Sequence, residues 1–131
     1  MKSESIIQSE IMMHAALYGI VLTKNNVGAG QFVDDETNNK SFVRFGLFNA
    51  SREQQAKLKS SDLIGIYPYQ TIAHGTIGVF VAVECKKEGW KYSGTPREVA
   101  QKAFIDFVKS KGGLAGFAAS VDDFLKIINK I

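Results

Sequence analysis

The chain has 131 residues, of which 45% are hydrophobic and 22% are charged, and its formal net charge is +3. This length fits one domain around a single buried core, and the composition is that of an ordinary globular protein. The one cysteine, Cys85, excludes an intramolecular disulfide and a cysteine-based zinc site. We therefore expect a single domain over residues 1–131, mildly basic and compatible with a nucleic-acid partner.

The first predicted element is a helix over residues 5–18. Helical spacing places Ile6, Glu10, Met13 and Leu17 on one stripe. Glu10 is then a carboxylate on an otherwise apolar stripe. It is either a partly exposed boundary residue or an acid that faces inward for a functional reason.

A short strand is predicted at residues 20–23, followed by a flexible loop at 27–40 that is rich in Gly, Asn and Asp. Residues 41–47 alternate as a strand does, and residues 49–61 form a polar insert with helix-compatible residues at 52–59. Two apolar runs, 63–67 and 78–83, predict two further strands joined by a connection over 68–76.

The clearest helix start is Thr95-Pro96-Arg97-Glu98, which combines an N-cap hydroxyl, proline at the first helical position and glutamate three residues after the cap. This helix should end at Gly112-Gly113, and it places Gln101 on the stripe of its apolar residues. A strand at 114–119 and a final helix capped by Ser120 follow. The apolar side of that helix is formed by Phe124, Leu125, Ile128 and Ile131. The predicted fold is an α/β sandwich, a small mixed sheet flanked by helices.

Charged residues stand at the ends of the two central strands. Asp62 opens one of them, and Glu84-Cys85-Lys86 closes the other. Since side chains alternate along a strand, Glu84 and Lys86 should face one way and Cys85 the other, as a buried structural thiol. Two carboxylates with a lysine beside them can hold a hard divalent cation for phosphodiester hydrolysis. The alternative for each residue is a turn-bonding aspartate or a solvated strand end.

The order of these residues and elements along the chain resembles that of the PD-(D/E)xK nuclease superfamily. More narrowly, it resembles the VRR-NUC family in its stand-alone phage and bacterial form. The stretches that carry the resemblance are Ser9-Glu10, Asn25-Asn26-Val27-Gly28-Ala29, residues 61–66, residues 80–86, Gln101 and Gly112-Gly113-Leu114-Ala115. The resemblance implies a restriction-endonuclease-like sandwich that depends on Mg²⁺ or Mn²⁺.

The resemblance also implies the roles of the site residues. Asp62, Glu84 and the backbone carbonyl of Cys85 would bind the metal, and Glu10 would belong to the same acidic centre. Lys86 would orient or activate the attacking water, with Gln101 supporting the site. The expected protein is a structure-selective endonuclease, a homodimer acting on branched DNA such as four-way (Holliday) junctions.

Candidate DNA contacts are cationic or polar residues scattered along the chain. They are Lys24, Asn26, Arg44, Lys57, Lys59, Lys87, Lys91 and Arg97. Trp90 and Tyr92 could stack on an unpaired base or close the edge of the core.

The alternative from another class is a DNA junction- or end-binding module with a nuclease fold and no turnover. A third is an RNA- or nucleotide-processing domain, for which no phosphate-binding glycine-rich loop is present in the sequence. No apolar stretch reaches transmembrane length, and residues 1–5 lack the apolar core of a signal peptide. We expect a soluble cytoplasmic protein, of a bacterial cell or a phage-infected host, with no membrane partner.

Overall fold

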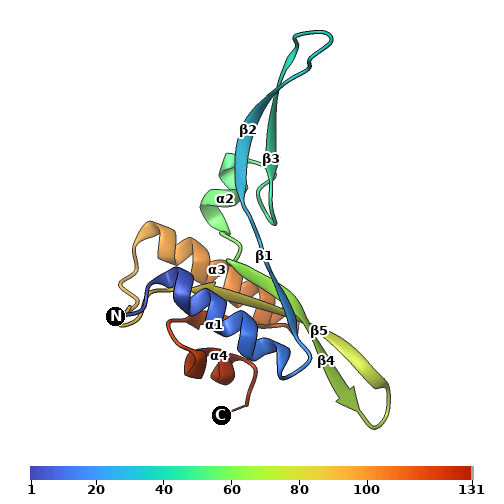
Figure 1. The fold of residues 1–131 in the computed structure, drawn as a ribbon, viewed down its shortest axis with the longest axis vertical. Helices are drawn as coiled ribbons and strands as arrows, with labels where there is room; N and C mark the ends of the chain where they lie inside the picture. Colours follow the sequence, from blue (N-terminus) through green and yellow to red (C-terminus); the bar gives the residue numbers. More distant parts are fainter. Residues whose placement is uncertain (131) are drawn as a thin grey trace.

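The computed structural model describes residues 1–130, which form a mixed sheet with helices on both faces (Figure 1). The elements are α1 (Glu4–Ala16), β1 (Val21–Lys24), β2 (Gly28–Val33), β3 (Lys40–Phe45), α2 (Arg52–Lys57), β4 (Leu63–Thr71), β5 (Gly75–Cys85), α3 (Pro96–Ser110), β6 (Leu114–Ala118) and α4 (Val121–Ile127). The main sheet has the order β1-β4-β5-β6, and only the β5–β6 pair is parallel. The predicted α/β class is confirmed.

Two apolar clusters hold the layers together. One joins α1 and α4 to one face of the sheet, with Ile11, Leu63, Val83 and Phe124 fully buried in it. The other joins α3 to the opposite face through Phe104, Val108, Ala82 and Ala115. Because neighbouring residues of β5 enter different clusters, the predicted alternation along this strand is confirmed. Cys85 lies buried in the first cluster.

Helix α1 buries a different stripe from the predicted one. Ile7, Ile11 and Ala15 face the core, whereas Met13 and Leu17 are exposed. Apolar residues lie on several sides of this helix, so its sequence alone did not determine which side packs. The prediction that Glu10 stands on the core-facing stripe is wrong, because that stripe faces outward.

The predicted capping box of α3 is confirmed. The Thr95 hydroxyl accepts from the Glu98 backbone N–H, and the Glu98 carboxylate accepts from the Thr95 backbone N–H. The final helix is confirmed as well, with Ser120 as its N-cap. Ile131, predicted to extend the apolar side of that helix, lies outside the described residues.

Two predicted connections are strands instead. The predicted loop at 27–40 contains β2, and the predicted connection at 68–76 is mostly strand with a turn at residues 72–74. Pro68 lies within β4, beyond the last residue that pairs with β1, so that side of the strand is an edge where proline is tolerated. Local glycine and proline content therefore misled the prediction at both places.

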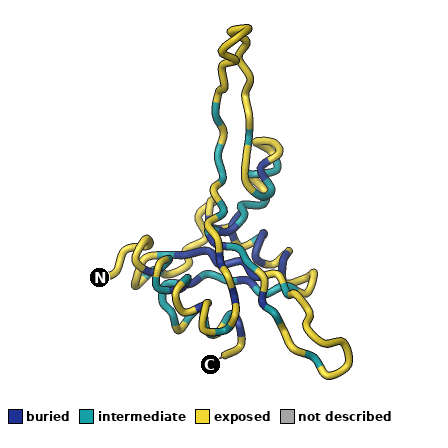
Figure 2. The backbone as a smooth tube through the Cα atoms, turned by 45° about the vertical axis from the view of Figure 1, so that its right-hand side comes forward, coloured by how far each residue is buried: buried dark blue, intermediate teal, exposed yellow. Residues whose placement is uncertain are grey.

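The β2–β3 hairpin forms an arm that projects from the body, and its two strands pair only with each other (Figure 1). Figure 2 shows that the arm is mostly exposed along its length. At its base Gly46 adopts a positive φ of 95°. A Cβ there would lie 2.7 Å from the Asn26 carbonyl oxygen, so only glycine fits. No helix within residues 1–130 is long and apolar enough to span a membrane.

Candidate active site

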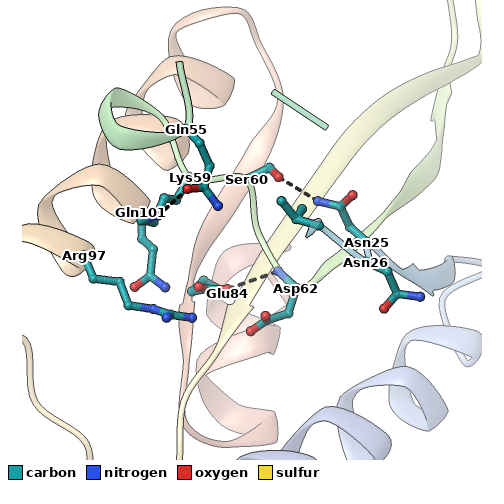
Figure 3. Close-up of a pocket in the computed structure, with 10 residues that line it drawn as sticks. Asn25, Asn26, Gln55, Lys59, Ser60, Asp62, Glu84, Arg97 and Gln101 are labelled. Atoms are coloured by element: carbon teal, nitrogen blue, oxygen red, sulfur yellow. Dashed lines mark hydrogen bonds between the residues drawn. The ribbon is translucent and has the colours of Figure 1, made fainter. Parts of the chain in front are cut away.

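Two of the predicted strand-end residues, Asp62 and Glu84, line a pocket of about 400 Å³ between β1, the insert that contains α2, and the start of α3 (Figure 3). Its lining residues are Asn25, Asn26, Val27, Gln55, Lys59, Ser60, Asp62, Glu84, Arg97 and Gln101. Asp62 and Glu84 face each other across adjacent strands, just beyond the Leu63–Val83 pair. Arg97 extends toward them from the first turn of α3 (Figure 3).

Two hydrogen bonds hold the Asp62 and Glu84 carboxylates across the strands. The Asp62 backbone N–H donates to Glu84 Oε2 at 3.1 Å, and the Cys85 backbone N–H donates to Asp62 Oδ2 at 3.0 Å. Each carboxylate is thus fixed by the backbone of the opposite strand. This cross-strand arrangement brings together the two acids that are 22 residues apart in sequence.

Glu84 is buried, and its pKa is raised to about 9. Burial contributes most, followed by the hydrogen bond with the Asp62 side chain and the negative charge of Asp62, while the Lys86 ammonium acts in the opposite direction. At neutral pH the pair therefore shares a proton. A divalent cation would offset the charge of both carboxylates in this buried position, so the donor set fits a hard divalent ion.

The acidic set is small. Within residues 1–130 no group of three or more His, Cys, Asp or Glu side chains is placed to hold one metal ion. A cation at Asp62 and Glu84 would need other oxygen ligands, and the Cys85 carbonyl, water and substrate phosphate are the chemically suitable ones. The Cys85 thiol is not a candidate, because burial raises its pKa far above the usual range.

Lys86 lies beside the acidic pair and is held by three partners. Its Nζ donates to Gln101 Oε1 at 2.8 Å and sits 5.3 Å from the Trp90 ring centroid and 5.7 Å from that of Phe117. Gln101 is buried on α3, so the polar residue predicted on the apolar stripe meets the predicted lysine. The ammonium is close enough to Glu84 to lower the pKa of that carboxyl.

Trp90 belongs to the wall around Lys86. Its ring packs on Phe117 with centroids 4.8 Å apart, and its Nε1–H donates to Glu98 Oε2 at 2.8 Å. Of the two roles considered for Trp90, closing the edge of the core agrees with these contacts. Tyr92, which touches the same cluster, stays exposed.

Glu10 lies outside the pocket. It forms an ion pair with Lys2, Nζ to Oε1 3.0 Å, in a separate depression shared with His14 and Glu88. The structure therefore does not bring Glu10 to Asp62 and Glu84. The reason is the rotation of α1, which turns the Glu10 side away from the core.

Glu4 is a carboxylate of α1 whose pKa is affected by the charged residues of the site. Burial raises its pKa most, followed by the charge of Asp62, while Lys86 and Arg97 lower it. Glu4 precedes Ile7 by three residues and Ile11 by seven, so it lies on the same side of α1 as the buried residues, although it is itself exposed. If the buried stripe of α1 had been predicted correctly, the sequence would have placed Glu4 on the same side of the helix as Ile7 and Ile11.

The polar insert forms one wall of the pocket, and Asn25 ties it in place. The Asn25 Nδ2 donates to Ser60 Oγ at 2.8 Å and to the Ser61 carbonyl at 2.9 Å, while its Oδ1 accepts from the Leu47 N–H at 3.2 Å. One asparagine thus joins the end of β1, the end of the arm and the insert. Gln55, Lys59 and Ser60 were not predicted to line the site, because the insert's position depends on this tertiary network.

The candidate DNA contacts divide into free and engaged side chains. Lys24, Asn26, Lys87 and Lys91 are exposed, and Asn26 and Arg97 lie at the pocket. Arg44 donates from Nε to the Asn49 carbonyl at 3.1 Å and from Nη2 to Asn49 Oδ1 at 2.7 Å, which braces the base of the arm. Its contacts support a structural role rather than the predicted one.

Comparison with known proteins gives no relative for this chain: no family model, no curated protein and no solved structure matches it. The structure of the chain itself defines its class. It is a mixed α/β domain with helices on both faces of the sheet and an acidic pair at the ends of β4 and β5.

Proposed function

We propose that this chain is a metal-dependent DNA endonuclease of the PD-(D/E)xK type, with a restriction-endonuclease-like fold similar to that of VRR-NUC domains. The observation that carries the proposal is the coupled Asp62–Glu84 pair with Lys86 beside it. A buried carboxyl that must hold a proton at neutral pH destabilises the metal-free fold. This loss of stability in the metal-free protein is expected where a cation completes the site.

The proposed roles follow from the chemistry of each side chain. Asp62 and Glu84 would hold Mg²⁺ or Mn²⁺ together with the Cys85 carbonyl. When bound there, the cation offsets charge on phosphoryl oxygens and lowers the pKa of its bound water. Lys86 orients a water or offsets developing negative charge, and Gln101 fixes the direction of its ammonium.

Arg97 and Lys59 line the same pocket from α3 and the insert. Both cations can contact the phosphates on either side of the scissile bond. We further propose that the substrate is branched DNA and that the active form is a homodimer, so that two pockets act on two strands.

A second candidate is a DNA-binding module with the same fold and no turnover. Two observations favour it: Lys86 is already hydrogen-bonded to Gln101, and Glu10 does not join the acidic pair. Such a protein would bind junctions or ends through its exposed cations.

Cleavage assays separate the two candidates. The purified protein is incubated with a labelled four-way junction, a flap and a linear duplex, in Mg²⁺, in Mn²⁺ and in chelator. We expect metal-dependent cleavage that Glu84→Ala abolishes and Glu10→Ala retains. Cleavage that survives chelator or Glu84→Ala would refute the mechanism, and junction binding without cleavage in either metal would favour the module.

A further inference from the structure

One face of the arm is apolar and carries no charged side chain. The β2–β3 register puts Gly28, Gly30, Phe32, Ser41, Val43 and Phe45 on this face. Phe32, Val43 and Phe45 remain 57%, 40% and 47% exposed. The opposite face carries Lys40 and Arg44 beside the exposed Val33 and Phe42. A two-stranded ribbon is marginally stable in water by itself, so its apolar face needs a cover.

A second apolar surface lies on the main sheet, on the face that α3 covers only in part. Val21 of β1, Ile66 of β4 and Phe80 of β5 are neighbours there by strand register, and they are 82%, 60% and 37% exposed. They line a shallow hollow of about 540 Å³ together with Ile64 and Pro68. This bare sheet face and the apolar arm face lie in one chain, and each lacks a partner within residues 1–130.

We propose that the occupant of each surface is a second copy of this chain, with the arm of each protomer laid across the bare sheet face of the other. The size of the two surfaces supports this. With full side-chain areas on the order of 150–200 Å², their six exposed residues leave roughly 500–600 Å² of apolar surface per protomer. A standard interface buries about 800 Å² per partner, of which about 500 Å² is apolar.

The length and charge of the arm agree with this partner. Six residues of β2 extend about 20 Å, enough to cross the three strands of the bare face. The turn at the arm's tip presents Asp34, Asp35 and Glu36, and hydrogen bonds from the Glu36 and Thr37 N–H groups lower the pKa of Asp34. An acidic tip is repelled by DNA phosphates, whereas Lys111 stands in the apolar hollow that adjoins the bare face at Phe80.

This exchange of arms between two protomers extends the proposed function, and it rests on the homodimer that the proposed function includes. The arm starts directly after Val27 and returns to Leu47, so its base adjoins the Asn25-centred wall of the pocket. Reciprocal arms would therefore connect the two active sites through the pocket walls. An interface in which the same patches meet twice is the usual form of a two-fold dimer.

Self-association is measured by light scattering and sedimentation over a concentration series. We expect twice the 14.4 kDa chain mass for the protein itself. Phe32→Glu in the arm and Ile66→Arg on the sheet should each raise the dimer Kd by at least about 30-fold. Phe42→Glu on the charged arm face and Ile72→Arg at the β4–β5 turn are matched controls that should stay dimeric. Circular dichroism verifies that every variant is folded.

Mixing the two disruptive variants tests the exchange itself. The Ile66→Arg chain keeps an unaltered arm, and the Phe32→Glu chain keeps an unaltered sheet face. An unaltered arm can therefore pack on an unaltered sheet face only between unlike chains. A tagged heterodimer that assembles on mixing is the expected result. A monomeric wild type, a dimeric disruptive variant or no heterodimer would overturn the proposal.

Cleavage of a four-way junction and of linear duplex in Mn²⁺ is measured in parallel on the same samples. A dimer without cleavage would reject the proposed function and leave the exchange standing. Cleavage by a monomeric wild type would reject the exchange and leave the proposed cleavage activity standing.

Discussion

Replacement of the Glu84 carboxyl by an amide should change how the free energy of unfolding depends on pH. In the folded, metal-free protein the pKa of Glu84 is about 9, against 4.5 for the unperturbed carboxyl. Between these values the folded state binds one proton more than the unfolded state. The stability contributed by that proton is complete below pH 4.5 and is lost as the pH rises toward 9, by about 1.4 kcal/mol per pH unit.

Glu84→Gln eliminates this titration with little change of shape. The amide oxygen can still accept from the Asp62 N–H, and the NH₂ can donate to the Asp62 carboxylate as the protonated acid does. In chelator, the free energy of unfolding of the variant relative to wild type should therefore rise by about 3 kcal/mol between about pH 5.5 and 7.5. This corresponds to a relative gain in Tm of roughly 10 °C for a domain of this size.

Urea unfolding at several pH values in chelator provides the measurement. Glu36→Gln, at the exposed tip of the arm, is the matched control and should follow wild type. Excess Mg²⁺ or Mn²⁺ should stabilise wild type by about 2.7 kcal/mol at 100 times Kd and should stabilise Glu84→Gln much less. A difference between wild type and Glu84→Gln that stays constant with pH would refute the shared-proton reasoning.

Three further outcomes are expected. Lys86→Met should reduce metal-dependent cleavage by about 100-fold and leave the metal-induced rise in Tm in place, because its ammonium acts on water or charge rather than on the cation; loss of the Tm response would place Lys86 in metal binding instead. Glu4→Gln should change the Mn²⁺ affinity measured by calorimetry, because the charge of Asp62 acts on Glu4, whereas Glu10→Gln should not, because Glu10 pairs with Lys2 outside the pocket; the reverse result would contradict the observed rotation of α1. Asn25→Ala should lower the urea-derived free energy of unfolding by about 2–3 kcal/mol through its three lost hydrogen bonds, and Asn26→Ala, exposed beside it, should serve as the neutral control; equal effects of the two variants would reject the role of Asn25.

The sequence by itself determined the features that depend on local pattern. The capping box of α3 needs only the order Thr95 to Glu98, and the opposite directions of Glu84 and Cys85 follow from strand geometry. The place of Gln101 on the apolar stripe of α3 also followed from helical spacing. These features could be predicted because neighbours in sequence fix them.

Other features were decided by contacts between distant segments. Apolar residues on several sides of α1 left its rotation open, and packing on the sheet selected the Ile7 side, which placed Glu10 outside the pocket. The arm, rich in glycine and polar residues at its start, forms only because β2 and β3 pair across a long turn. The proton on Glu84 arises from burial beside Asp62, 22 residues away in sequence. In each case the deciding energy belongs to a pair of surfaces rather than to one segment.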